Sequence, residues 1–498
     1  MNTHYDVLII GAGLSGIGMA CRLTRECPDK RFAILERRQA IGGTWDLFRY
    51  PGIRSDTDMC CFGFEFRPWD GIKVMGDGPI IREYVTDTAR EYGVDKKIQF
   101  GQKITQAAWS SETASWTVTA LDEASGQERR YTCSYLISCT GYYNYDQGFL
   151  PEFPGEARFH GLRIHPQHWP EQLDYKGKRV VVIGSGATAV TLVPAMAQGG
   201  AQHVTMLQRS PSYIFSIPAY DKVSEFLCKL LPERWVFGFA RRRNIFFQRA
   251  LYKAAKRWPE RVRAFLLNGV KKRLPEGYDM RHFTPRYMPW DERLCAVPDA
   301  DLFNAISAGK ASVVTDHIET FTENGIKLQS GKQLEADIII TATGLNIQLF
   351  GGIDVTLDGH RGDVGKLMTY KGTLIQDVPN LGIIVGYTNA PWTLKADLSS
   401  RYLCRLFKYM DDKQMRVFTP RAPQGEMLDE NILGSLGSGY IRRADDLLPR
   451  QGRALPWRVL HNYEQDRPML LKDPVDDGVL QFTPAPESAN AEKVSLAA

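Results

Sequence analysis

Tyr5-Asp-Val-Leu-Ile-Ile10, followed directly by Gly11-Ala-Gly13-Leu-Ser15-Gly16, is the stretch that decides the fold. The apolar run is typical of a buried strand, and the G-x-G-x-x-G turn leads into a helical pattern. A second apolar run, Phe32-Ala-Ile-Leu35, ends in the acid Glu36. Strand, glycine turn, helix, strand and acid, in this order, predict a dinucleotide-binding unit.

Each glycine of the turn has its own physical task in such a unit. Gly11 permits the tight turn, and Gly13 lets the backbone approach a pyrophosphate at the positive end of the helix. Gly16 allows the helix to pack closely on the strand. Glu36 would accept hydrogen bonds from a ribose. We therefore expect Gly11, Gly13, Ser15, Gly16 and Glu36 to bind the first nucleotide.

The same pattern recurs in the middle of the chain. Arg179-Val-Val-Val-Ile183 precedes a second glycine turn, and Val204-Thr-Met-Leu207 forms the next apolar run. Arg209 follows Gly184 by the same 25 residues by which Glu36 follows Gly11. A guanidinium there favours a 2′-phosphate, so the count predicts NADPH rather than NADH. The alternative is a surface charge beside Ser210-Pro211. The residues expected to bind this second nucleotide are Ile183, Gly184, Ser185, Gly186, Ala187, Thr188, Ala189, Gln208 and Arg209.

Composition narrows the class of protein. The chain has 498 residues, of which 43% are hydrophobic and 24% charged, so wholesale disorder and a small disulfide-rich scaffold are excluded. A net charge of +5 over this length does not indicate nucleic acid as a partner. The nine cysteines show no C-x-x-C spacing, so we expect no metal site, and reduced thiols in a cytoplasmic protein. No signal peptide is evident at the N-terminus.

The repeat predicts an α/β fold with two Rossmann-like domains, the second inserted in the first. We expect residues 1–145 to form the first segment of one nucleotide-binding domain and residues 346–480 its return segment. Residues 146–345 would form the second domain, with a helical insert at about 220–290. Residues 481–498 are poor in bulky apolar side chains, and we expect a disordered tail there.

Two dinucleotides in one chain suggest hydride transfer from a nicotinamide to a flavin. A flavin that reduces disulfides needs a redox-active cysteine pair beside it. Gly42-Gly-Thr-Trp45, after the first helix, offers none, and the adjacent Cys60-Cys61 would form a strained disulfide. Disulfide reduction is therefore disfavoured.

Two longer motifs carry a family resemblance. Phe159-His-Gly161-Leu-Arg-Ile-His165-Pro-Gln-His-Trp169-Pro170 matches F-x-G-x-x-x-H-x-x-x-W-P at every fixed position. Gly42-Gly-Thr-Trp45 and the following Tyr50-Pro-Gly-Ile-Arg-Ser-Asp56 look like G-G-x-W…Y-P-G-x-x-x-D. In both, the chain resembles the Baeyer–Villiger monooxygenases, which are class B flavoproteins. The sequences of Ile164-His-Pro-Gln-His-Trp-Pro170, Gln208-Arg-Ser-Pro211 and Thr341-Ala-Thr-Gly-Leu-Asn346 are similar to those of the ethionamide-activating monooxygenase subgroup.

The resemblance implies an activity. NADPH would reduce bound FAD, the reduced flavin would add O₂ at C4a, and the resulting peroxide would insert one oxygen atom beside a ketone carbonyl, giving an ester or lactone. Sulfoxidation of a thioether is the implied side activity, so the partners are a ketone or sulfide and O₂. A heteroatom-hydroxylating flavin monooxygenase is the nearest alternative, and Trp169-Pro170 argues against it. A flavin-binding, membrane-associated redox partner without an organic substrate is the other alternative.

The resemblance also assigns roles to residues. Arg293 would be the catalytic cation near the developing negative charge, and Asp56 would hold and tune it. Without the resemblance, an exposed ion pair of Arg293 with Asp291 or Glu292 and a turn-capping role for Asp56 are the alternatives. Many family members have a lysine directly before this arginine, where it helps to bind the 2′-phosphate of NADPH. Here that position is Glu292, so we expect NADPH affinity to depend more strongly on Arg209. The remaining positions assigned to the cofactor are Thr44, Trp45, Asp46, Leu47, Arg54, Ser55 and Ile104. We expect His165 to be a hinge or packing residue.

Residues 220–274 form a basic helical stretch with 15 Lys or Arg against four Asp or Glu. Apolar residues recur there near a 3.6-residue period on either side of Pro259. We favour an insert packed over the substrate channel with a solvated basic face. The alternative is an amphipathic surface that binds acidic lipid, which would place a cytoplasmic protein peripherally at the membrane.

Overall fold

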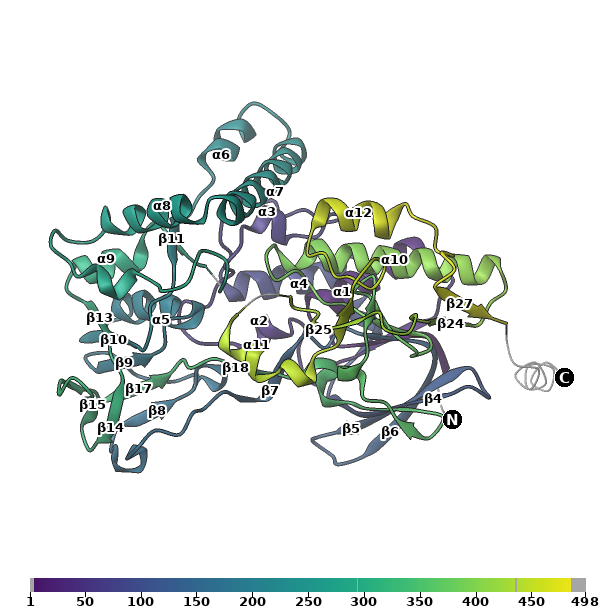
Figure 1. Cartoon of the computed structure of the whole chain (residues 1–498), viewed down its shortest axis with the longest axis horizontal. Helices are drawn as coiled ribbons and strands as arrows, with labels where there is room; N and C mark the ends of the chain where they lie inside the picture. Colours follow the sequence, from purple (N-terminus) through teal and green to yellow (C-terminus); the bar gives the residue numbers. More distant parts are fainter. Residues whose placement is uncertain (1–3, 293, 435–436, 485–498) are drawn as a thin grey trace.

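The computed structural model describes residues 4–292, 294–434 and 437–484 of the chain. It confirms the predicted α/β class, with two parallel-strand units at opposite ends of the molecule (Figure 1). From residue 485 on, the expected tail lies outside the described residues. The start of that tail was placed wrongly, because strand β27 (Leu480–Thr483) pairs with β24 (Val417–Pro420).

The first sheet has β1 (His4–Ile10) between β2 (Phe32–Leu35) and β6 (Glu128–Ser138), and β1 runs parallel to both. Its strands come from two distant stretches of sequence, so the sheet joins early and late parts of the chain. The other early strands are β3 (Ile98–Gln99), β4 (Gln102–Ser110) and β5 (Ser115–Asp122). The late ones are β19 (Asp354–Leu357), β20 (His360–Arg361), β21 (Thr369–Tyr370), β22 (Leu374–Ile375) and β23 (Leu381–Ile383).

The second sheet has five parallel strands in the order β13-β10-β9-β17-β8. Their apolar sequences suit strands that are covered on both faces. The apolar stretch from Val180 to Ala201 forms the end of β9, a glycine turn and the buried helix α5, which contains Pro194. The strands are β8 (Leu162–Ile164), β9 (Arg179–Ile183), β10 (His203–Gln208), β13 (Ala311–Thr315) and β17 (Ile338–Thr341), with helices α5 (Ala187–Gln198) and α9 (Asp301–Ser307).

The first sheet is covered by α1 (Leu14–Glu26) and α10 (Trp392–Asp412), which pack on each other. Between the sheets lies a strand, β7 (Tyr143–Gly148), antiparallel to β18 (Leu345–Ile347). Smaller helices and strands connect and flank the two sheets. They are α2 (Thr44–Leu47), α3 (Met59–Phe62), α4 (Gly78–Glu91), α11 (Gly439–Arg443), α12 (Tyr463–Leu471), β14 (Ile318–Thr322), β15 (Gly325–Leu328), β16 (Gln333–Glu335), β25 (Met427–Asn431) and β26 (Arg450–Gly452).

The basic stretch forms three helices, α6 (Lys222–Cys228), α7 (Glu233–Arg257) and α8 (Pro259–Lys271), beside the strand pair β11 (Ile214–Ile217) and β12 (Cys295–Pro298). The break at Pro259 lies where the sequence predicted it, because proline suits the first turn of a helix. Figure 1 shows α6 and the adjoining end of α7 projecting from the body of the molecule. No helix in the described ranges is both long and apolar enough to span a membrane.

Candidate functional site

One large cavity, of about 1180 Å³, lies where the two glycine turns face each other. Gly11, Gly13 and Ser15 line it from the β1–α1 turn, and Ala187 and Thr188 line it from the first turn of α5. Because both helices begin at the cavity, their unpaired N–H groups and positive dipole ends are directed at the same space. This is the arrangement that two bound pyrophosphates require.

The first turn has the backbone geometry that only glycine adopts without strain. Gly11 has φ +101°, and a Cβ there would lie 2.7 Å from the carbonyl oxygen of Cys139. A Cβ on Gly16 would lie 1.9 Å from the carbonyl oxygen of Gly11. Gly16 is therefore a packing glycine away from the cavity lining. Ser15 is at the cavity, where its Oγ accepts a 2.7 Å hydrogen bond from the indole of Trp392.

Glu36 is buried at the cavity wall at the end of β2. Its two carboxylate oxygens accept hydrogen bonds from the backbone N–H groups of Ala12, at 2.6 Å, and Arg38, at 2.7 Å. Each oxygen keeps a lone pair for a further donor, as a ribose would supply. Burial raises the pKa of Glu36, and the two backbone donors oppose that shift.

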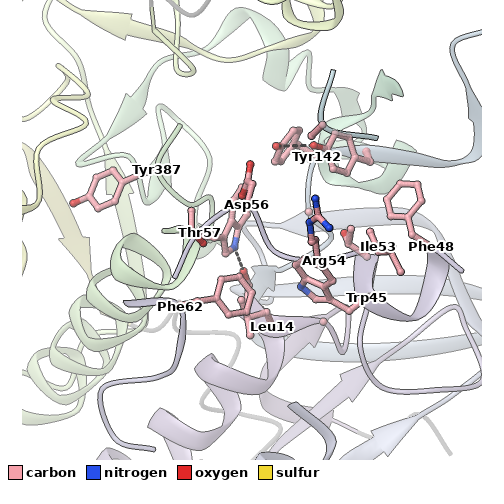
Figure 2. A pocket seen from close by; sticks show the side chains of 18 of the residues that line it. Leu14, Trp45, Phe48, Ile53, Arg54, Asp56, Thr57, Phe62, Tyr142 and Tyr387 are labelled. Carbon is pink, nitrogen blue, oxygen red and sulfur yellow. Dashed lines mark hydrogen bonds between the residues drawn. The ribbon is translucent and has the colours of Figure 1, made fainter. Parts of the chain in front are cut away.

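Residues 44–58 form one wall of the cavity (Figure 2). Trp45 lies edge-on to Phe62, with ring centroids 5.7 Å apart, and Asp56 is exposed to the cavity. Arg54 donates from Nη1 to Asp301 at 2.7 Å. Its Nε and Nη2 are buried and have no hydrogen-bond partner among the described residues. Buried guanidinium donors without a partner are costly, so this site fits an acceptor-rich ligand such as a nucleotide. Thr44 and Ile104 also line the cavity.

Three residues that the resemblance assigned to the cofactor do not line the main cavity. Asp46 is buried among the guanidinium groups of Arg38, Arg49 and Arg82, at the edge of a smaller cavity of about 500 Å³. Leu47 packs in the core beneath the second sheet, and the buried Ser55 hydroxyl is hydrogen-bonded within its own loop to Thr57. The structure thus gives these positions supporting contacts behind the wall.

The second turn is only partly at the cavity. Gly184 has φ +141°, and Ile183 and Ala189 are buried in the core. The Ser185 hydroxyl donates to the carbonyl of Ser210 at 2.8 Å. Gly186 has open space where a Cβ would stand, which permits close approach of a ligand. None of these residues lines the cavity. From this part of the chain only Ala187 and Thr188 line it.

Strand pairing corrects the predicted register of Arg209. Gly11 donates its N–H to Leu35, and Gly184 donates its N–H to Leu207, both at 2.8 Å. Gln208 in the second unit is therefore equivalent to Glu36 in the first. Arg209 is one residue further on and is equivalent to Arg37. The count was wrong by one because the second helix and its loop are one residue shorter. Gln208 is buried, bonded to the carbonyl of His282, and Arg209 is exposed.

Arg293 lies outside the described residues. Its neighbours Glu292 and Leu294 both line the cavity, as does Trp290. Burial raises the pKa of Glu292, while the positive charges of Arg442 and Arg209 oppose that shift. The segment expected to carry the catalytic cation therefore borders the same space as Asp56.

Several cavity residues had no assigned role in the sequence. Asp58 is buried, caps α3, and accepts hydrogen bonds from Asn244, at 3.0 Å, and from Gln248. Tyr142 and Tyr387 line the cavity from the far side (Figure 2). Asp58 could have been noticed as a helix cap two residues after Asp56. The contacts from α7 join positions more than 180 residues apart, and no local pattern announces them.

His165 has the predicted packing role. Its Nε2 lies 3.1 Å from the carbonyl oxygen of Gly344, and its Nδ1 accepts the N–H of Gln167 at 3.2 Å. The ring fills the space where a Cβ on Gly148 would stand. Burial lowers its pKa. His165 therefore packs the crossing segments between the two sheets.

Two strand–turn–helix units of dinucleotide type, facing one cavity, define the class of α/β oxidoreductases with two nucleotide sites. The chain belongs to the flavin-binding monooxygenase-like family, whose model matches residues 4–408.

Relatives match over nearly the full length. The chain is 61% identical over 488 residues to the putative FAD-containing monooxygenase MymA of Mycobacterium tuberculosis, covering 97% of this chain and 99% of that protein. It is 51% identical over 487 residues to the FAD-containing monooxygenase EthA of the same organism, covering 98% and 99%. Among solved structures, an oxidised steroid monooxygenase bound to NADP matches with a TM-score of 0.78 at 21% identity, covering 97% and 100%. The last likeness concerns the fold.

Proposed function

We propose that this protein is an FAD- and NADPH-dependent Baeyer–Villiger monooxygenase that converts a ketone to an ester or lactone, with sulfoxidation as a side activity. One observation carries the proposal. The first glycine turn and the start of α5, which follows the second one, border a single cavity, so a flavin and a nicotinamide could meet there. The names of the relatives, FAD-containing monooxygenases, and the NADP-bound structural neighbour support the choice of cofactors.

FAD reduced by NADPH supplies the activation of O₂ and the transfer of one oxygen atom. The chain supplies the binding and the electrostatics. Gly11, Gly13 and Glu36 would hold the flavin nucleotide, and the free guanidinium donors of Arg54 would satisfy acceptors inside the cavity. Ala187 and Thr188 would receive the NADPH pyrophosphate at the start of α5, with Arg209 on the 2′-phosphate.

The reaction on a ketone develops negative charge on oxygen. A fixed cation in a water-poor cavity stabilises such a charge far more strongly than the same cation would in water. We propose Arg293 for this role, next to the lining residues Glu292 and Leu294, and Asp56 as the carboxylate that orients it. Ring faces from Trp45, Phe62 and Tyr387 make the remaining wall apolar enough to hold a ketone.

The test is aerobic NADPH turnover with linear, cyclic and aryl ketones and one thioether, with products identified by mass. Esters or lactones carrying one atom of labelled O₂ support the proposal. Hydroxylated nitrogen or sulfur products without any ester would favour the heteroatom-hydroxylating alternative. Stoichiometric H₂O₂ alone, with every substrate unchanged, would reject oxygen insertion.

Arg293→Ala separates the two halves of the reaction. We expect flavin reduction by NADPH, followed anaerobically by flavin absorbance, to stay within about two-fold of the wild type. The rate of ester formation should fall by about 10²-fold or more, because the cation stabilises the negative charge that develops on oxygen after the flavin has been reduced. Normal lactone yield in this variant would remove Arg293 from the mechanism.

A further inference from the structure

The helices α6 and α7 and their connecting loop, residues 222–257, form an arm whose outer face is apolar and uncovered. Trp235, Phe239 and Phe246 are spaced i, i+4 and i+11 along α7, so they share one face of the helix. Trp235 is 64% exposed and Leu230, in the preceding loop, 67%. We call the set the apolar stripe: Phe226, Leu230, Leu231, Trp235, Phe239 and Phe246.

The inner face of the same helix is firmly attached to the body of the protein. Phe237, on the side of α7 opposite to the stripe, is buried, as are Val236 and Ala240 on its flank. Arg241 donates to the carbonyl oxygens of Cys60, at 2.8 Å, and Gly63, at 2.7 Å, while Asn244 and Gln248 bind Asp58. The stripe is therefore held outward, and rotation of α7 to bury it would break these contacts.

Positive charge is abundant in the stretch of chain that carries the stripe. Between residues 220 and 274, eleven Lys or Arg residues are exposed, against three exposed Glu residues. Among the described residues, Lys229, Arg234 and Arg242 form no ion pair, although they lie beside the stripe in sequence. Large aromatic side chains ringed by unpaired cations are complementary to a bilayer surface with anionic headgroups. A patch of this kind on a face left in water would otherwise favour aggregation.

The mouth of the cavity lies where the arm joins the body of the protein. Tyr220, Val223 and Phe247 are 51%, 55% and 61% exposed, and all three also line the cavity. Phe247 contacts Phe246 of the stripe, with ring centroids 5.8 Å apart. The stripe and the cavity lining are thus adjacent at Phe246 and Phe247.

We propose that the arm docks the protein on an anionic lipid bilayer, with the apolar stripe in the interfacial region and the mouth of the cavity at the membrane surface. Apolar substrates dissolved in the bilayer would then enter between Val223 and Phe247. Substrate entry rests on the proposed function, whereas docking does not. In Figure 1 the arm extends away from both sheets, so docking there leaves the body of the protein in water.

Vesicle flotation of the purified, flavin-loaded full chain tests the docking. We expect flotation with vesicles of equal parts phosphatidylcholine and phosphatidylglycerol, and little with phosphatidylcholine alone. Trp235→Ser with Phe239→Ser should lower vesicle affinity by about ten-fold or more. Lys229→Glu with Arg242→Glu should have a similar effect and reduce the dependence on salt.

Matched controls come from exposed residues outside the arm. Leu150→Ser with Leu447→Ser removes comparable exposed apolar side chains, and Lys310→Glu with Lys332→Glu makes the same change of charge. Both control variants should float like the wild type. Equal flotation of the wild type and the Trp235/Phe239 variant would overturn the proposal. So would a lipid-independent dimer that this variant loses, because a second copy would then cover the stripe.

Turnover gives an independent measurement of substrate entry. With a long-chain ketone held in anionic vesicles, the Trp235/Phe239 variant should be about ten-fold slower than the wild type. With a short, water-soluble ketone the two should agree, because neither residue lines the cavity. Equal rates on the vesicle-bound ketone would reject entry from the membrane. If the wild type oxidises neither ketone, the proposed function fails, while flotation still decides the docking.

Discussion

Glu36 and Gln208 stand at the same place in the two nucleotide-binding units, at the end of the second strand, and they differ in charge. A buried carboxylate would repel a 2′-phosphate, whereas an amide does not. The exposed Arg209 follows Gln208 and offers a bidentate cation just beyond it. We therefore expect the second unit to be the one that binds NADPH.

Arg209→Ala should raise the apparent KM for NADPH by about ten- to a hundred-fold, the value of one charge-assisted hydrogen bond. The KM for NADH should change much less. Steady-state kinetics with both coenzymes measure the ratio. As a control, Arg37→Ala alters the corresponding position of the first unit and should leave the ratio unchanged. Equal changes for NADPH and NADH in the Arg209 variant would refute the phosphate assignment.

We expect His461 to make the stability of the protein depend on pH near neutrality. Its Nε2 lies 2.8 Å from the carbonyl oxygen of Ile432, and its buried Nδ1 has no partner in the described part of the chain. Burial lowers the pKa of His461 below that of a free histidine, about 6.5. The unfolded chain therefore binds the proton first, so the stabilisation is present above about pH 6.5 and is lost as the pH falls through the folded pKa.

We expect the thermal midpoint of the wild type to fall between about pH 7 and pH 5, and that of His461→Gln to fall less steeply. Thermal unfolding in saturating FAD gives both curves. His165 and His282, whose pKa values burial also lowers, should keep some slope in the variant. Parallel curves for the two proteins would show that His461 is not the group that titrates.

At the scale of one element, two glycines of the β1–α1 turn have different roles. One is needed for packing and the other lets a ligand come close. A Cβ on Gly16 would lie 1.9 Å from a backbone oxygen, which only a shift of the turn can relieve. A Cβ on Gly13 would lie 3.4 Å from the Cα of Gly43, close to ordinary contact, and would project at the cavity wall. The two glycines should therefore fail in different ways when replaced by alanine.

Gly16→Ala should lower the free energy of unfolding by about 1–3 kcal/mol, with or without flavin. Gly13→Ala should leave the flavin-free protein within about 1 kcal/mol of the wild type and weaken FAD binding by about ten-fold or more. Urea unfolding of flavin-free protein and fluorescence titration with FAD measure the two quantities. Loss of stability in both variants, with unchanged FAD affinity in Gly13→Ala, would contradict this division.

At the scale of the whole molecule, a buried ion pair joins two helices from distant parts of the chain. Arg22 of α1 binds Asp397 of α10 through two bonds, Nε to Oδ1 at 2.7 Å and Nη2 to Oδ2 at 2.8 Å. Both side chains are less than 9% exposed. Since α1 belongs to the early part of the chain and α10 to the late part, this pair helps to close the first nucleotide-binding unit.

Arg22→Met should destabilise the protein by about 3–5 kcal/mol, because it leaves a buried carboxylate unpaired. Adding Asp397→Leu should recover most of the loss. Chemical denaturation of the single and double variants provides the comparison. Lys327→Met, which removes one member of the surface pair with Glu319, is the control and should cost less than about 1 kcal/mol. If the double variant is no more stable than Arg22→Met, the loss of stability comes from side-chain packing at this site and not from the unpaired charge of Asp397.

The sequence by itself determined the two strand–turn–helix units and the family, because glycine geometry and strand periodicity are local and leave a signal within about 30 residues. The strands Phe32–Leu35 and Arg179–Ile183 have the predicted bounds. Counting along the chain failed at Arg209, where strand pairing, not spacing, sets the register. The resemblance assigns Asp46 to the cofactor, and only the folded chain shows that its carboxylate is held in ion pairs with Arg38 and Arg49 behind the wall of the main cavity.

Only the tertiary structure decided what faces the cavity and what faces outward. Asp58, Asn244 and Gln248 meet there although α3 and α7 are far apart in the sequence. Helical periodicity in residues 233–257 shows that α7 has two faces, but packing against α3 decides which one is covered. Burial depends on contacts summed over the whole chain. A local pattern can therefore predict an apolar face of a helix, but only the folded molecule shows whether another part of the chain covers that face.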